Sequence, residues 1–132
     1  MSTDRMEITD LFTHLANLLD ERRHDDCRRV YHPDVVARSP LGAEMRGVEE
    51  VIAHLRRSQV DGLRTQHVHG DVLVEVDGDR ATTSANQLVY FYRDGEPPHR
   101  RSGLRITGTA VRTPAGWRID ETTIKLLWTQ ED

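Results

Sequence analysis

Apolar and polar residues alternate with a period of two through the second half of the chain, from about residue 64 onward. Short segments rich in Gly, Pro and Asp interrupt this alternation at 77–79, 94–98 and 113–116. Segments of this kind are typical of hairpin turns. The pattern therefore predicts strands over four ranges, 66–76, 80–93, 103–113 and 117–129. Strands of this length curl strongly when they form one antiparallel sheet.

The first half of the chain has helical spacing instead. Apolar residues predict an amphipathic helix over 6–19, a second short helix over 27–31 and a third helix over 48–55. Pro33 should end the second helix, because the residue before a proline is pushed out of the helical region. A short strand is predicted at 35–37. Helices followed by a long meander of strands are typical of an α+β domain, and we expect one such domain over residues 1–132.

Composition excludes several classes of protein. A net charge of −4 with both signs scattered lacks the basic stripe that nucleic-acid binding requires. With 30% charged residues and no long apolar run, no membrane span is expected. Cys27 is the only cysteine, so no disulfide can form within one chain. The first twenty residues lack the features of a secretory signal, and we expect a cytoplasmic protein.

Large apolar side chains occupy both faces of the predicted strands, as with Leu88 and Tyr90 against Val89 and Phe91. Helices can cover only one of these faces. A soluble monomer rarely exposes a large apolar patch, so we expect a homodimer through the open face of the sheet. Trp128 near the chain end would either close a pocket or pack in the core or in this dimer interface.

The predicted order of elements is helix, helix, strand, helix and four strands. Together with the segment "VYHPDVVARSP…MRGVEEVIAHLRR", this order resembles the SnoaL-like branch of the nuclear transport factor 2-like superfamily. The resemblance covers nearly the whole chain. It implies a cone-shaped, cystatin-like α+β fold in which three N-terminal helices pack on a curved antiparallel sheet. A small organic molecule would bind in the cone.

A shorter segment, "GLRTQHVHG" at 62–70, is similar to the scytalone dehydratase-type enzymes. That similarity implies that His67 is catalytic and that Asp20, in "LLDERRHDD", orients it. Periodicity alone places Asp20 away from the centre of the apolar stripe, as for a solvated carboxylate. Those enzymes also use two tyrosines and a second histidine, where this chain has Leu19, about Ala37, and approximately Tyr92.

Strict alternation puts His67, His69 and Asp71 on one face of the strand over 66–76. The opposite face carries three valines, Val68, Val72 and Val74. If the valine face is the core, the histidines face solvent or a dimer interface. A His-x-His pair with Asp71 could also present ligands to a metal ion, but no further ligand is evident, and no metal or cofactor is predicted.

Side chains on the next two strands are predicted to face the same way as His67 and to form a mostly apolar wall with a few polar groups. With His69 and Trp128, the predicted substrate-binding set is Asn86, Leu88, Tyr90, Tyr92, Arg105 and Thr107. The two tyrosines could donate hydrogen bonds to a substrate oxygen. Arg105 is either an outward-facing charge or a buried cation that needs a carboxylate such as Asp20 or an acidic ligand.

The function predicted from these residues is a cofactor-independent lyase or isomerase, dehydratase-like or cyclase-like, that removes a proton beside a carbonyl. His67 would be the base and Asp20 would fix its tautomer. The alternative is a non-catalytic ligand-binding or dimerisation module with the same fold, which the missing tyrosines and second histidine favour.

Overall fold

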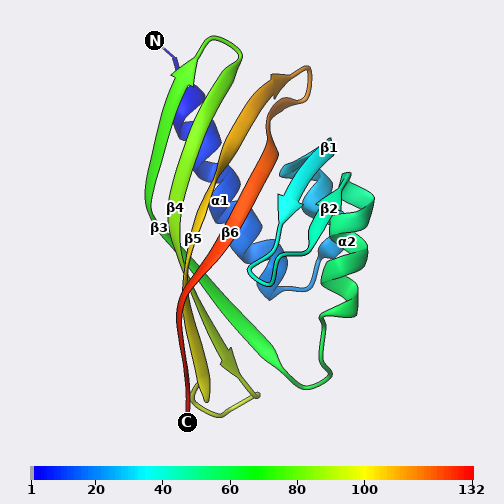
Figure 1. Ribbon diagram of the computed structural model, residues 1–132, viewed down its shortest axis with the longest axis vertical. Coiled ribbons are helices and arrows are strands. Elements are labelled where there is room, and N and C mark those ends of the chain that lie inside the picture. The colour runs from blue at the N-terminus through cyan, green and yellow to red at the C-terminus, as the bar shows by residue number, and fades with distance from the viewer. Residues whose placement is uncertain (1) are drawn as a thin grey trace.

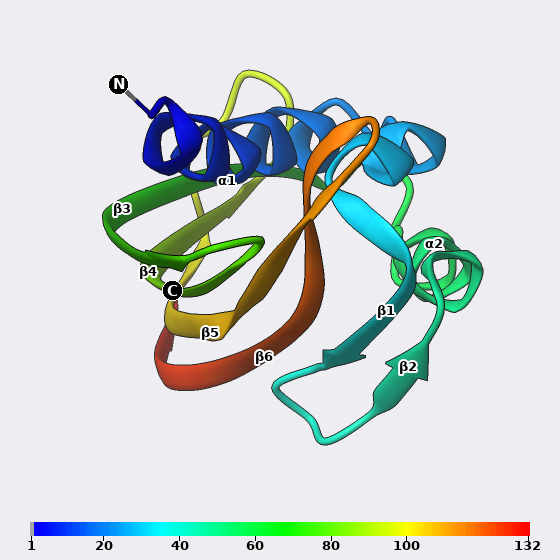
Figure 2. The same cartoon turned by 90° about the horizontal axis from the view of Figure 1, so that it is seen from above.

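The computed structural model describes residues 2–132, which form one long curved sheet with helices on its inner side (Figure 1). In chain order the elements are α1 (Asp4–Asp20), the 3-10 helix η1 (His24–Arg29), β1 (Tyr31–Arg38), β2 (Glu44–Arg46), α2 (Val48–Arg57), β3 (Arg64–Asp77), β4 (Arg80–Tyr92), β5 (Arg100–Thr113) and β6 (Gly116–Glu131). Seen from above, the sheet bends around α1, which lies along the inner side of the curve (Figure 2). The α+β class and the four long strands are therefore confirmed.

The sheet has the strand order β2-β1-β6-β5-β4-β3. All neighbouring strands are antiparallel except β1 and β6, which run parallel, so the prediction of a purely antiparallel sheet is wrong at this pair. The short strand predicted at 35–37 extends back to Tyr31 and includes Pro33, which falls where the pairing with β6 is irregular. β2, with three residues, was too short to predict.

The prediction of three N-terminal helices is correct only in part. α1 has 17 residues and α2 has ten, but the segment between them is a six-residue 3-10 helix that ends before Tyr31. A 3-10 turn is common in short connections, and Val30 and Tyr31 instead lead into a strand. No helix within residues 2–132 is sufficiently long and apolar to cross a membrane.

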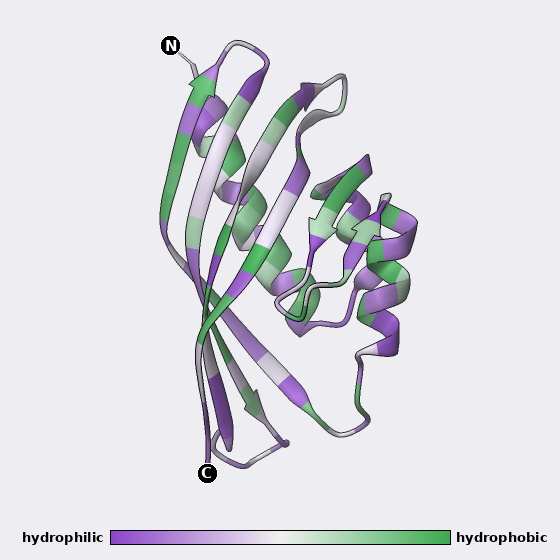
Figure 3. Cartoon of the chain, in the orientation of Figure 1, coloured by the Kyte–Doolittle hydropathy of each residue, from purple (hydrophilic) through white to green (hydrophobic). Residues whose placement is uncertain are grey.

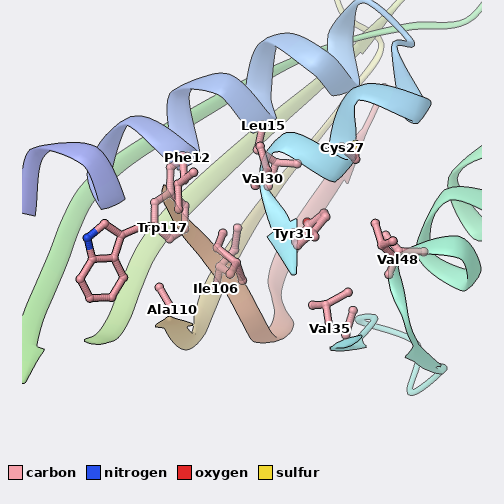
Figure 4. Close-up of a cluster of buried hydrophobic side chains, with 14 of the residues drawn as sticks. Phe12, Leu15, Cys27, Val30, Tyr31, Val35, Val48, Ile106, Ala110 and Trp117 are labelled. Atoms are coloured by element: carbon pink, nitrogen blue, oxygen red, sulfur yellow. The ribbon is translucent and has the colours of Figure 1, made fainter. Parts of the chain in front are cut away.

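The hydrophobic core lies between α1, β1 and the middle of the sheet (Figure 4). Its largest side chains include Phe12 and Trp117, and both are 2% exposed. The indole nitrogen of Trp117 donates to Asp4 at 3.1 Å, and Arg112 forms an ion pair with the same carboxylate at 2.7 Å. These hydrogen bonds lower the pKa of Asp4. The start of α1 is thereby attached to the far end of the sheet.

A bulge interrupts β3 between Gly70 and Leu73, and Asp71 within it has a positive φ of 50°. An inserted residue breaks the alternation of the strand. An odd-numbered residue before the bulge and an even-numbered residue after it therefore lie on the same face. His67 and Val74 consequently both face α1. The half of β3 before the bulge is mostly hydrophilic and the half after it mostly hydrophobic (Figure 3).

Candidate active site

Asp20 is the last residue of α1 and contacts the start of β3. Its Oδ1 atom lies 2.6 Å from Nδ1 of His67. The Thr65 hydroxyl donates to the same oxygen at 3.1 Å, and the backbone N–H of His67 donates to Oδ2 at 2.9 Å. Three groups of β3 therefore hold one carboxylate, and Asp20 lies on the flank of α1 that faces this strand.

The pair is partly shielded from water, since the side chains of His67 and Asp20 are 14% and 22% exposed. A carboxylate beside Nδ1 favours a proton on that nitrogen and leaves Nε2 with a free lone pair. Within residues 2–132, Nε2 of His67 has no hydrogen-bond partner. The arrangement can therefore accept a proton from a bound molecule at Nε2.

His69 lies deeper on the same face. Its Nε2 atom is 3.0 Å from the Gln87 amide nitrogen, and its ring meets Phe12 edge-on with 5.8 Å between centroids. Its Nδ1 atom is buried and has no partner among the described residues. Burial, and then the charge of His67, lower the pKa of His69 to about 4, so it is neutral at physiological pH. The hypothesis that these histidines face solvent is wrong.

Asn86, Leu88, Tyr90 and Tyr92 lie on the outer face of the sheet, so the prediction that they share the face of His67 is wrong. Residues directly opposite each other in an antiparallel pair share a face, and His67 is opposite Val89. Beyond the bulge, the register places Val74 opposite Thr83 and Asp77 opposite Arg80. Continued without the bulge, that register would bring His67 opposite Tyr90. The unpredicted bulge is the reason for the error.

The same shift puts Arg105 and Thr107 on the outer face, opposite Asn86 and Ser84. Arg105 donates to the Asn86 side chain at 3.0 Å and 3.2 Å, and Asn86 donates to Asp71 at 3.0 Å. Arg105 is thus an outward-facing charge, and the buried-cation hypothesis is wrong.

Trp128 is 47% exposed and opposite Gly103 in the sheet. Its indole occupies the space in which a side chain at Gly103 would stand. Gly103 is in turn opposite Leu88, which places the indole on the outer face. Trp128 therefore does not close the site beside His67.

Sequence reasoning missed the residues that share the inner face with His67 on β4 and β5. These are Gln87, Val89, Phe91, Arg100 and Ser102. Gln87 and Ser102 are 5% and 4% exposed, and the Ser102 hydroxyl is 3.0 Å from that of Thr129. A usable signal was the set of small or apolar side chains at odd positions of β4, which fit a face covered by a helix: Ala81, Ala85, Val89 and Phe91.

A cleft of about 530 Å³ lies on the other flank of α1, between that helix and the turn joining β5 to β6. Its lining includes His14, Asn17 and Trp117 but neither Asp20 nor His67. Among residues 2–132, no group of three or more His, Cys, Asp or Glu side chains is arranged to hold a metal ion, and Asp71, within the bulge, accepts a hydrogen bond from Asn86 on the outer face.

A curved six-stranded sheet around one long helix, with a carboxylate–histidine pair where the helix ends, defines a cystatin-like α+β domain. The family model of the SnoaL-like domain matches residues 1–123, and the chain belongs to this family. An uncharacterized protein of Mycobacterium tuberculosis (strain H37Rv) is 32% identical over 126 residues, which covers 89% of this chain and 81% of that protein.

Solved structures agree on the fold. A nuclear transport factor 2-like protein with a cystatin-like fold from Novosphingobium aromaticivorans is 29% identical, with a TM-score of 0.77, and the match covers 94% of this chain and 82% of that one. A candidate scytalone dehydratase from the same species is 13% identical, with a TM-score of 0.85 and coverage of 98% and 88%. At that identity, the second match shows the fold alone.

Proposed function

We propose that the protein is a cofactor-independent lyase or isomerase, dehydratase-like or cyclase-like, that acts on a small cyclic organic molecule. The observation that carries the proposal is the 2.6 Å contact between Asp20 and Nδ1 of His67. Such a pair fixes the tautomer of an imidazole and leaves its second nitrogen as a base. The SnoaL-like family and a fold neighbour named as a candidate dehydratase support the same class of reaction.

In this reaction Nε2 of His67 takes a proton from a carbon beside a carbonyl group. The electron pair of the broken C–H bond forms an enolate, and in a dehydratase it then expels a β-hydroxyl group. The imidazolium returns its proton to that hydroxyl, which leaves as water. Asp20 keeps its hydrogen bond to Nδ1–H throughout and stabilises the positive imidazolium. A positioned base of this kind contributes about 10²–10⁴-fold to the rate.

Proton abstraction can be tested before the substrate is known. The protein is incubated in D2O with a panel of cyclic ketones and β-hydroxyketones, and deuterium beside the carbonyl is followed by NMR and mass spectrometry. We expect exchange of at least one compound above the buffer rate, and a loss of about 100-fold or more in His67→Gln. His14→Gln is the matched control, because His14 lies on the exposed side of α1 and should leave exchange unchanged.

The alternative, a non-catalytic ligand-binding or dimerisation module, predicts different results from the same panel. A module would bind some of these compounds without exchanging their protons. Equal exchange in the wild type, in His67→Gln and in buffer would contradict the catalytic proposal and favour the module.

A second copy of the chain is the partner that best fits the outer face of the sheet. Val68, Leu88, Gly103 and Trp128 form one row across four strands there, and Val68 and Trp128 are 46% and 47% exposed. Exposed apolar rows of this kind mark interaction surfaces. We expect a homodimer in analytical ultracentrifugation and a monomer for Trp128→Glu.

Leu41→Glu provides the matched control for that experiment, because Leu41 is 94% exposed in the loop before β2. It should leave the dimer intact. A monomeric wild type at high micromolar concentration would contradict the dimer.

A further inference from the structure

Arg100 is an inward-facing cation at the open end of the sheet. It is opposite Phe91, which is opposite Thr65 in the next strand. The Thr65 hydroxyl binds Asp20, so this row faces the same side as the Asp20–His67 pair. Neighbouring strands are about 4.8 Å apart, which puts the backbone of Arg100 about 10 Å from that of Thr65. At this separation, one small ring compound can contact both side chains.

The charge of Arg100 is only partly offset by its neighbours. The Cζ atom lies over the Phe91 ring, 4.6 Å from its centre, in cation–π contact. The Nε atom is buried and has no hydrogen-bond partner among residues 2–132. The nearest carboxylate, Glu131, is 3.5 Å from Nε and its side chain is 66% exposed, so water screens this pair.

The next residue, Arg101, faces the other side of the sheet. It is opposite Tyr90 on the outer face, and its guanidinium donates to the Gln130 side chain at 3.1 Å and to the Pro98 carbonyl at 3.5 Å. Two adjacent arginines therefore point to opposite faces, and only Arg100 shares a face with His67.

We propose that Arg100 binds an anionic group of the substrate, so that the site selects planar cyclic compounds that carry a carboxylate. The planar guanidinium matches a carboxylate with two parallel hydrogen bonds. The partly buried Phe91 side chain offers an apolar surface for the ring between Arg100 and His67. This substrate class rests on the proposed function, because His67 is taken as the reacting end of the site.

The test uses two probes of the same shape, 2-naphthoate and 2-naphthamide, which differ in charge. Their binding to the full-length protein is measured by calorimetry, and the His67 imidazole resonance is followed by NMR. We expect the acid to bind at least tenfold more tightly than the amide, to shift the His67 resonance, and to lose this preference in Arg100→Gln.

Further variants show whether the preference for the acid depends on Arg100 itself. Arg101→Gln should retain the preference, Arg100→Lys should retain part of it, and Glu131→Gln should tighten acid binding by removing a competing carboxylate. His67→Gln should also retain the preference for the acid. A negative deuterium-exchange assay combined with an intact preference would therefore refute His67 as the base and still support Arg100 as the anion site. Equal binding of acid and amide by the wild type, no binding of either below 20 mM, or an unchanged preference in Arg100→Gln would overturn the proposal.

Discussion

The two halves of β3 present different chemistry to the same helix. Before the bulge, the face toward α1 carries Thr65, His67 and His69, and these residues contact Asp20, Phe12 and Gln87. After it, the same face carries Val72 and Val74, which pack into the hydrophobic core. One inserted residue thus divides a single strand into a half that carries the candidate site, here called the functional half, and a half that packs in the core, the structural half. A bulge beside an active site commonly redirects a strand in this way.

The comparison teaches where substitutions should be tolerated. The structural half is sealed under α1, so polar atoms there would have no partners. The functional half already contains polar groups with defined hydrogen bonds, and it lies next to the uncovered end of the sheet. Substitutions in the structural half should therefore act on stability and those in the functional half on chemistry.

The largest expected effect is that of Val74→Asp. Val74 is 6% exposed, and an unpaired carboxylate there should lower the free energy of unfolding by about 3–5 kcal/mol. Leu73→Asp is the control in the same strand, because Leu73 is 69% exposed, lies outside the apolar row of the proposed dimer and should cost less than about 1 kcal/mol of folding stability. Urea unfolding measures both, and equal losses would contradict the burial of Val74 under α1.

The next effect is a dependence of stability on pH in the functional half. The pKa of His69 is about 4 in the folded protein and near 6.5 when unfolded, so below 6.5 the unfolded chain binds a proton that the native state does not. The contribution of His69 is complete above pH 6.5 and falls by up to about 3 kcal/mol as the pH drops to 4.

His69→Leu should flatten this part of the curve. At pH 7 the variant should lose about 1–2 kcal/mol, because the amide of Gln87 is left without its partner. Denaturant titrations between pH 4 and 7 provide the measurement. Parallel curves for wild type and variant would show that His69 is not the titrating group.

A smaller effect is expected at the bulge itself. Asp71 has a positive φ, which a β-branched side chain adopts poorly, so Asp71→Val should cost about 1–2 kcal/mol of folding stability. It should also disturb the His67 resonances by pulling the register toward the unbulged pairing. Leu73→Val, at a residue that is 69% exposed, should change stability by less than about 0.5 kcal/mol. An unchanged spectrum for Asp71→Val would separate the bulge from the site.

The elements of this fold could largely be predicted from the sequence, because hairpin turns and helical spacing are local signals. The family resemblance also identified Asp20 and His67, which the structure brings together, and their catalytic role stays a prediction. The rest of the site could not be predicted, because it depends on register. One inserted residue near Asp71 exchanges the faces of β4 relative to His67, and its one local signal, Gly70 followed by an aspartate within the alternating segment, does not fix the register.

The tautomer of His67 tests the catalytic pairing most directly. Long-range ¹⁵N–¹H NMR of the neutral imidazole reports which nitrogen carries the proton. With Asp20 in place we predict the proton on Nδ1 and a bare Nε2, and in Asp20→Asn we expect a shift of population toward the Nε2–H form. A wild-type protein whose neutral His67 carries its proton mainly on Nε2 would contradict the assignment of that atom as the base.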